Sequence, residues 1–331
     1  MRAAAILGLG SSTRDLKPFQ HDPKIDWLIG LPAASNEADV VVIFGGDGTV
    51  HRHLAQLVKL QLPVLVVPCG SGNDFARALG LRDVRASLSA WREVCEKGPN
   101  VRAIDLGVIV PVRSDSEHFA PGLKPISSQD PDAGLKVRSS TAVHAPLGQG
   151  TYFCCVGGVG LDGEIARRAN RLPRWLRGHG GYAISFPGAL VRFAPLQMTI
   201  LLPSTETSDF AEHRKQPTVV TIFANTPVYG GGMRVAPKAL LDDGRLDICL
   251  VREVSKLKLL YLFPTVYYGR HLGVAEVEYF QTDRLRLETE RPLDVYADGE
   301  YVCRTPIEVS VAPRALGVVV SGAQAAGRAR S

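Results

Sequence analysis

The chain has 331 residues and a formal net charge of +5, from 38 lysines and arginines against 33 acids. This mild basic excess, with 7% aromatic residues and no nucleic-acid-binding motif, argues against nucleic acid as a partner. No apolar run approaches the roughly 18 residues of a membrane-spanning helix. The six cysteines lack C-x-x-C spacing, which predicts reduced, buried thiols. The length is sufficient for two domains.

The first strong signals are two apolar runs, of which the second is rich in β-branched residues and is followed by a glycine-rich turn. Ala3–Leu9 and Val40–Phe44 are predicted strands, and the second runs directly into Gly-Gly-Asp-Gly-Thr at residues 45–49. Glycines let a ligand approach the backbone closely, and the amide N–H groups of such a turn can form a concave site for anions. A structural turn seldom needs three glycines around Asp and Thr, so this turn is predicted to hold phosphate.

A second turn follows the next strand along the chain. Residues 63–67 are a predicted buried strand, followed by Cys-Gly-Ser-Gly at residues 69–72 and by a helix capped by Asn73 or Asp74. Residues 51–60 have the apolar spacing of a helix between the two strands. Ligands of parallel α/β sheets bind beyond the carboxyl ends of the strands. Both turns are therefore expected to meet at one nucleotide, although neither is a dinucleotide fingerprint or a Walker loop.

Beyond a boundary near residues 104–106 the pattern changes to short strands with glycine and proline turns, which is typical of an antiparallel β-sandwich. The expected fold is a three-layer α/β nucleotide-binding domain at residues 1–105, followed by a β-sandwich domain at residues 106–321. Residues 113–149 are expected to be a flexible insertion, and residues 322–331 a tail. The strands expected in the second domain are Asp105–Val112, Tyr152–Val156, Gln197–Leu202, Thr218–Ala224, Leu246–Val251, Glu276–Phe280, Arg284–Glu288, Leu293–Ala297 and Pro306–Ala312.

Further blocks follow the two turns in a fixed order. They are Ile-Asp-Leu-Gly at residues 104–107, Tyr-Gly-Gly-Gly-Met at residues 229–233 and Asp-Gly-Glu at residues 298–300. With the two turns, these blocks resemble the diacylglycerol kinase catalytic domain family of bacterial lipid kinases, in a superfamily with sphingosine and ceramide kinases. The resemblance covers most of residues 40–320. It implies a lipid kinase that uses ATP and Mg²⁺ in a cleft between an α/β domain and a β domain.

The resemblance also implies which residues form the active site. The phosphates of ATP are expected between two lysine-free loops, formed by Gly45, Gly46, Asp47, Gly48 and Thr49 and by Gly70, Ser71, Gly72 and Asn73. Glu300 is implied as the general base for the lipid hydroxyl, although an isolated Asp-Gly-Glu is more often a hairpin turn. Asp47, Asp105 and Asp298 are implied as carboxylates that organise Mg²⁺ through water, since Mg²⁺ keeps several waters in proteins.

Two other segments carry expectations. Relatives bind a structural Mg²⁺ in the segment that corresponds to residues 239–247, which implies Leu240 and Arg245 as carbonyl ligands and Asp243 as a side-chain ligand. A plain Asp-Gly turn is the alternative there. Residues 164–177 place repeated arginines beside Trp175, which is typical of a membrane-interface segment or of a solvated helix. The lipid substrate implies a cytoplasmic protein at the inner face of the membrane, and a homodimer is left open.

The chain departs from the family pattern at three places. The turn at residues 9–13 lacks the usual Asn-Pro, His51 and Arg52 replace Asn and Glu after the first glycine motif, and Cys154 or Cys155 replaces an Asn. All three places are expected near the nucleotide. Two alternatives therefore stay open. One is a kinase for another alcohol, such as a sphingoid, a polyisoprenoid or NAD, and the other is a nucleotide-binding sensor without catalysis.

Overall fold

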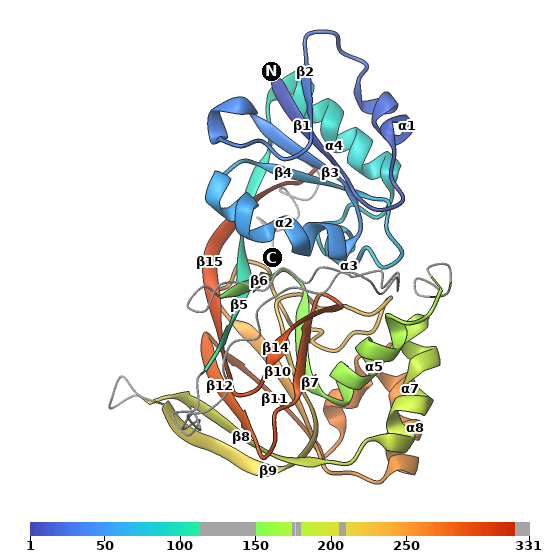
Figure 1. The fold of residues 1–331 in the computed structure, drawn as a ribbon, viewed down its shortest axis with the longest axis vertical. Helices are drawn as coiled ribbons and strands as arrows, with labels where there is room; N and C mark the ends of the chain where they lie inside the picture. Colours follow the sequence, from blue (N-terminus) through green and yellow to red (C-terminus); the bar gives the residue numbers. More distant parts are fainter. Residues whose placement is uncertain (113–149, 174–175, 177–179, 205–209, 322–331) are drawn as a thin grey trace, which may run out of the picture.

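The chain folds into two domains, one above the other in Figure 1. The computed structural model describes residues 1–112, 150–173, 176, 180–204 and 210–321. The expected insertion at 113–149, the tail at 322–331, and Arg174, Trp175 and Arg177 of the expected membrane segment lie outside the described residues.

The first domain is a parallel α/β unit, as predicted. Its strands lie in the order β2-β1-β3-β4, and every neighbouring pair is parallel. Strand β3 is buried along its whole length, which explains its unbroken β-branched sequence. The elements are β1 (Arg2–Leu7), α1 (Thr13–Leu16), β2 (Asp26–Ile29), β3 (Val40–Gly45), α2 (Asp47–Leu60), β4 (Val64–Pro68), α3 (Asp74–Ala78) and α4 (Val84–Lys97).

Helices α2 and α4 pack on this sheet through apolar faces. Val50, Leu54 and Leu57 of α2 are buried and follow the helical i, i+4, i+7 spacing. Trp91 of α4 is fully buried, and its indole N–H donates to the Phe19 carbonyl at 2.8 Å. Helix α2 begins at Asp47, so the first glycine motif forms the start of the helix that was predicted from residue 51.

Two long strands join the domains. Strands β5 (Val101–Pro111) and β15 (Ile307–Val319) pair in antiparallel register, from Ile307 opposite Pro111 to Val319 opposite Val101. At its far end β15 turns back into the first domain, where Val318 pairs with Val64 of β4. The predicted boundary at 105/106 therefore falls inside β5, and assigning β15 wholly to the second domain was wrong. A sequence read in order does not reveal such a long-range return.

The second domain is a set of antiparallel strands around its own core. They continue the sheet in the order β14-β13-β7-β9-β8-β12-β15, while β10 pairs with β9 and β11. The core includes Phe153 and Phe223, whose rings meet edge to face at 5.5 Å. The strands are β6 (Thr151–Phe153), β7 (Val156–Gly160), β8 (Leu196–Pro203), β9 (Phe210–Ala224), β10 (Leu246–Arg252), β11 (Val277–Thr282), β12 (Arg284–Thr289), β13 (Asp294–Ala297) and β14 (Glu300–Arg304).

Three helices lie together at one edge of this domain (Figure 1). They are α5 (Leu161–Ala169), α7 (Gly181–Arg192) and α8 (Lys256–Val266). The sequence predicted only β-strands for the second domain, so these three helices were not expected. Helices α7 and α8 each contain an internal proline, Pro187 and Pro264, and proline usually argues against a helix interior. Helix α5 begins the expected membrane segment, but its Arg167 and Arg168 are paired with Glu164 at 2.8 and 3.0 Å.

Candidate active site

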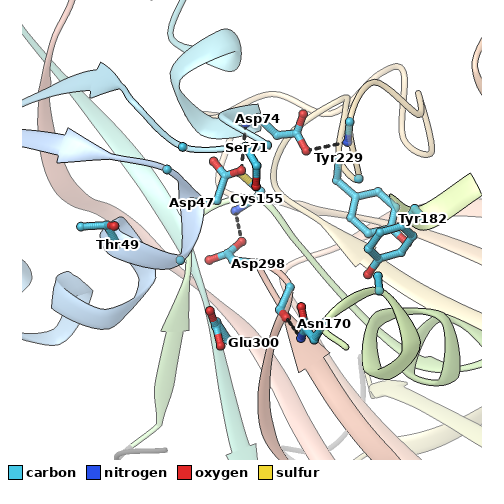
Figure 2. A pocket seen from close by; sticks show the side chains of 18 of the residues that line it. Asp47, Thr49, Ser71, Asp74, Cys155, Asn170, Tyr182, Tyr229, Asp298 and Glu300 are labelled. Carbon is cyan, nitrogen blue, oxygen red and sulfur yellow. Dashed lines mark hydrogen bonds between the residues drawn. The ribbon is translucent and has the colours of Figure 1, made fainter. Parts of the chain in front are cut away.

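A pocket of about 420 Å³ lies between the two domains, and both contribute to its lining (Figure 2). The predicted residues that line it are Gly46, Asp47, Gly48, Thr49, Gly70, Ser71, Gly72, Asp298 and Glu300. Gly45, Asn73 and Asp105 are not among the lining residues. The structure therefore brings nine of the twelve residues predicted for the nucleotide and for catalysis into one pocket, two of them from the opposite end of the chain.

The two glycine loops touch through their backbones. A Cβ placed on Gly70 would lie 2.3 Å from the Cα of Gly46 and 2.7 Å from its nitrogen, so no side chain fits between them. Asn73 has a left-handed backbone (φ +56) and closes the second loop, because its Oδ1 accepts the Gly70 N–H at 2.9 Å and its Nδ2 donates to the Gly70 carbonyl at 2.8 Å. Asn73, one of the two residues predicted to cap α3, is its N-cap residue, but its side chain makes no capping hydrogen bond and instead holds the loop at Gly70.

The start of α2 faces the pocket. Helix α2 begins at Asp47. The Thr49 N–H already donates to the Gly46 carbonyl at 2.9 Å, whereas the N–H groups of Asp47 and Gly48 make no hydrogen bond within the described residues and are available to an anion. The Asp47 carboxylate accepts the N–H groups of Asp74 and Phe75 at 3.0 and 2.9 Å. Burial raises the pKa of Asp47, and the charge of the neighbouring Asp74 raises it further. Asp47 thus ties the start of α3 to the start of α2.

The Asp-Gly-Glu turn joins β13 to β14 at the other side of the pocket. Asp298 and Gly299 both have positive φ angles, +50 and +82, as a type I′ hairpin turn requires. The Gly299 carbonyl accepts a hydrogen bond from the Asn170 side chain at 2.8 Å. This turn aims its two acids in different directions.

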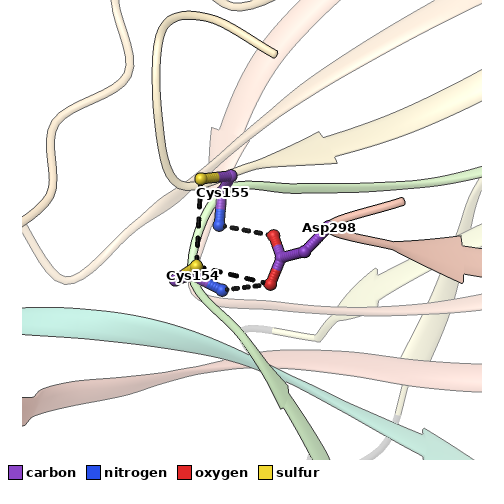
Figure 3. Close-up of side chains that lie close together, drawn as sticks. All are labelled: Cys154, Cys155 and Asp298. Atoms are coloured by element: carbon purple, nitrogen blue, oxygen red, sulfur yellow. Dashed lines mark hydrogen bonds between the residues drawn. The ribbon is translucent and has the colours of Figure 1, made fainter. Parts of the chain in front are cut away.

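Asp298 accepts hydrogen bonds from the backbone of Cys154 and Cys155, the two residues that precede β7 (Figure 3). Its Oδ1 accepts the N–H of Cys155 at 2.8 Å, and its Oδ2 accepts that of Cys154 at 2.9 Å. His51 of α2 also reaches Oδ2, with its Nδ1 at 3.0 Å. One of the departures from the family pattern therefore contacts the predicted catalytic turn directly.

Two buried thiols lie beside Asp298. Cys154, Cys155 and Asp298 place potential metal-ligand atoms within 4.8 Å of one another. Burial, together with the charge of Asp298, raises the pKa of both thiols, and that of Cys155 reaches about 12. All six cysteines are free.

Glu300 projects from the same turn toward the first loop (Figure 2). A Cβ placed on Gly48 would lie 2.7 Å from the Glu300 Oε1, so this carboxylate rests against the start of α2 in the other domain. The side chain lines the pocket and keeps contact with solvent. Within the described residues its carboxylate accepts no hydrogen bond, which leaves it available to a ligand.

Asp105 lies away from the pocket and contacts the loop before β10. Its Oδ2 accepts the N–H of Gly244 at 2.7 Å, its Oδ1 that of Arg314 at 2.7 Å, and its own N–H donates to Leu241. In that loop the Asp243 Oδ1 accepts the Arg245 N–H at 3.1 Å. The loop offers one carboxylate beside the carbonyls of Leu240 and Arg245, a sparse set for Mg²⁺ that water would complete. The second Mg²⁺ site stays a prediction.

Several residues of the pocket were not predicted as site residues. Asp74 lines it and accepts the N–H of Gly231 at 3.1 Å, which links the domains. Tyr182 and Tyr229 line it with their rings edge to face at 5.2 Å, and the Tyr229 hydroxyl donates to the buried Asp162. Burial raises the pKa of Asp162 to about 6. The signal for Tyr229 was its position in the Tyr-Gly-Gly-Gly-Met block at residues 229–233.

Two glycine loops, a helix start and an opposed carboxylate in an interdomain pocket define a phosphotransferase of the kinase class. The model of the family described as "Diacylglycerol kinase catalytic domain" matches residues 22–109. A second model, the "YegS C-terminal NAD kinase beta sandwich-like domain", matches residues 156–320. The chain belongs to the diacylglycerol kinase catalytic domain family and is a kinase, as the sequence predicted.

Individual relatives agree with this assignment. A diacylglycerol kinase of Mycobacterium tuberculosis is 32% identical over 293 residues, which are 87% of this chain and 78% of the relative. The putative lipid kinase YtlR of Bacillus subtilis is 24% identical over 83% of this chain and 78% of its own length. The crystal structure of a putative diacylglycerol kinase from Bacillus anthracis covers 97% of this chain and 95% of its own, with a TM-score of 0.66 at 17% identity, which supports the fold. None of the described helices has the length and apolar character needed to cross a membrane.

Proposed function

We propose that this protein transfers the γ-phosphoryl group of ATP to the hydroxyl of a lipid such as diacylglycerol. The observation that carries the proposal is the approach of Glu300, from the second domain, to Gly48 at the start of α2. Phosphoryl transfer depends on positioning and on charge stabilisation. The base that takes the proton of the acceptor hydroxyl has to lie beside the loop that binds the phosphates, and the Glu300 carboxylate lies at such a position.

The donor half of the reaction uses backbone groups. The start of α2, at Asp47 and Gly48, and the second loop beyond Gly70 present backbone N–H groups to the phosphates without a lysine, while the N–H of Gly70 itself is already bound by Asn73. The Thr49 and Ser71 hydroxyls supply further donors in the pocket. These groups hold the nucleotide, and they orient its terminal phosphate toward the gap in front of Glu300.

The acceptor half uses Glu300. The Glu300 carboxylate is exposed and makes no hydrogen bond within the described residues. It is therefore free to accept the proton of a lipid hydroxyl as the hydroxyl oxygen bonds to the γ-phosphorus and the bond from that phosphorus to ADP breaks. Asn170 and Asp298 fix the turn that carries it. Tyr182 and Tyr229 give the pocket an apolar wall beside the acceptor.

The carboxylates of the pocket fit a Mg²⁺ that is bound through water. Asp47 and Asp298 each accept at least two backbone N–H groups. Because their oxygens are already engaged, they suit contact with metal-bound waters better than direct ligation of Mg²⁺. When bound with ATP, Mg²⁺ would neutralise charge on the phosphates. We assign Asp105 and the loop with Leu240, Asp243 and Arg245 to a separate structural site.

Transfer of radiolabel from ATP to a panel of alcohols tests the proposal. The panel contains diacylglycerol, a sphingoid base, a polyisoprenol and NAD. Labelled phosphatidic acid as the main product supports the proposal. If another alcohol carries the label instead, that alcohol is the acceptor and diacylglycerol is not. Tight ATP binding with no transfer to any of them would favour the sensor and contradict a kinase role.

A further inference from the structure

Helices α7 and α8 expose large apolar side chains on one surface. Leu257, Tyr261 and Val191 are 81%, 80% and 72% exposed, although most side chains of this size are packed elsewhere in the molecule. We call the exposed set the α7–α8 patch. It consists of Ile184, Val191, Leu257, Leu260, Tyr261 and Tyr268.

The two helices lie side by side, and the start of α8 meets the end of α7. Lys256, at the start of α8, donates to the carbonyl of Val191 near the end of α7 at 2.7 Å. Further along, the rings of Phe186 and Phe263 stack with centroids 3.9 Å apart. These two contacts make the helices antiparallel, as their adjacent positions in Figure 1 allow.

The inner and outer faces of α8 are both apolar. Leu259 and Phe263 pack against the main core, whereas Leu257, Leu260 and Tyr261 point outward at i, i+3 and i+4. No residue of α8 is fully buried. A helix that is apolar on its solvent side as well as on its core side indicates a surface that is covered by a membrane or a partner during function.

The charge around the patch is positive on balance. Neither α7 nor α8 contains an acidic residue, and Arg192 and Lys256 lie on them, whereas Lys258 of α8 is paired with Glu276 at 2.6 Å and the exposed Glu253 precedes α8. At the end of α7 a hollow of about 320 Å³ is lined by Arg192, Arg291 and Arg304. Asp294 is paired with Arg304 and Glu164 with arginines of α5, which leaves Arg192 and Arg291 as the cations of the hollow without an ion pair among the described residues. Apolar residues rimmed by cations are typical of a helix that lies in the interface of an anionic membrane.

The first turn of α7 has the pocket on one side and the patch on the other. Tyr182 lines the pocket, and Ile184, two residues later and so on the opposite side of the helix, is half exposed at the patch. Helix α7 therefore contributes to both the pocket and the patch.

We propose that the α7–α8 patch docks on a bilayer that contains anionic lipid, with Leu257 and Tyr261 inserted at the level of the acyl chains. The bilayer contact stands on the exposed residues and their charges alone. The idea that docking brings the enzyme to its lipid substrate rests on the proposed lipid kinase function.

Vesicle binding without ATP tests the docking separately from catalysis. Flotation is measured on phosphatidylcholine vesicles with and without phosphatidylglycerol, for the wild type and for L257Q/Y261Q. The wild type should bind the anionic vesicles, and the variant should lose about tenfold or more in partition coefficient, or about 1.4 kcal/mol. L257M/Y261F should keep binding because it preserves apolar area, and I29Q, at an exposed apolar position of β2, should bind like the wild type.

Kinase activity separates the docking from the proposed function. On a water-soluble short-chain diacylglycerol, L257Q/Y261Q should keep wild-type activity, and it should lose activity only on vesicle-bound substrate. The docking proposal would be overturned if the wild type did not bind anionic vesicles, or if L257Q/Y261Q bound them as strongly as the wild type. A wild-type dimer that L257Q/Y261Q converts to a monomer, with vesicle binding unaltered, would overturn it too and make the patch a contact between two copies. Vesicle binding with no kinase activity would refute only the proposed function.

Discussion

His51 of the first domain and Asp298 of the second are joined by a 3.0 Å contact between Nδ1 and Oδ2. The same carboxylate accepts the backbone N–H groups of Cys154 and Cys155. Asp298 therefore fixes both the residues that precede β7 and the Asp-Gly-Glu turn to which it belongs. The departures at His51 and at the two cysteines lie in one cluster, which replaces family residues without separating the glycine loops from Glu300.

Replacing Asp298 by Asn should destabilise the fold. Asn tolerates the left-handed backbone of this position, so the change isolates the carboxylate. One acceptor oxygen becomes an NH₂ group that faces backbone N–H groups, and we expect a loss of about 1–3 kcal/mol in the free energy of unfolding. Urea unfolding measures it. A variant as stable as the wild type would show that these hydrogen bonds contribute little.

Replacing Gly48 by Ala should slow catalysis by displacing Glu300. The new Cβ would lie 2.7 Å from Oε1, so the carboxylate has to move, while alanine suits the first turn of a helix. A misplacement of about 1 Å can reduce kcat by about 100-fold. Steady-state kinetics measure the loss, and nucleotide affinity should change little. In a Glu300→Gln background the same change should add nothing, and additive losses would contradict the contact.

Replacing Gly70 by Ala should separate the two phosphate loops. Its Cβ would collide with the backbone of Gly46, which cannot move aside as a side chain can. We expect a loss of about 1–3 kcal/mol in stability and weaker ATP binding, measured by unfolding and calorimetry. Gly273→Ala is the control, since a Cβ there meets nothing within 4 Å. Equal effects of the two substitutions would count against the close approach of the loops.

The buried Asp162 should make stability depend on pH. Its pKa is raised to about 6 by burial, so the folded state holds a proton that the unfolded chain releases near pH 4. The free energy of unfolding should therefore fall as pH rises from about 4 to 6, by about 3 kcal/mol from this group. Asp162→Asn cannot ionise, and its stability relative to the wild type should rise over this interval. Parallel pH profiles from urea unfolding would contradict the assignment.

Asp243 should mediate stabilisation by Mg²⁺ at the loop before β10. Binding to the folded state alone adds about 2.7 kcal/mol when Mg²⁺ is at 100 times its Kd. Asp243→Asn should lose most of the rise in Tm that Mg²⁺ gives in the absence of nucleotide. Asp242→Asn is the matched control, because Asp242 pairs with Arg102 at 2.8 Å instead. Identical responses of the two variants to Mg²⁺ would exclude the predicted ligand.

The sequence predicted the parts of the fold that local pattern determines. The buried run of β3 and the glycines that follow it carry their structure in a few adjacent residues. The Asp-Gly-Glu turn was placed correctly beside the phosphate loops only because the chain resembles a family, since nothing local distinguishes it from an ordinary hairpin.

What the sequence did not predict depends on contacts between distant residues. Val318 returns to Val64 across most of the chain, and His51 meets Asp298 through the packing of two domains. Helices α7 and α8 were missed because Pro187 and Pro264 interrupt patterns that are apolar on nearly every side. Their packing against the core, rather than amphipathic periodicity, stabilises them.

The central claim is that Glu300 and the glycine loops act on the same phosphate from opposite domains. Its most direct test measures ATP affinity and phosphoryl transfer to diacylglycerol on the same preparations of wild type and Glu300→Gln. We predict ATP affinity within about threefold of wild type and a transfer rate lower by about 100-fold to 10,000-fold. Transfer at the wild-type rate by the variant would contradict the account.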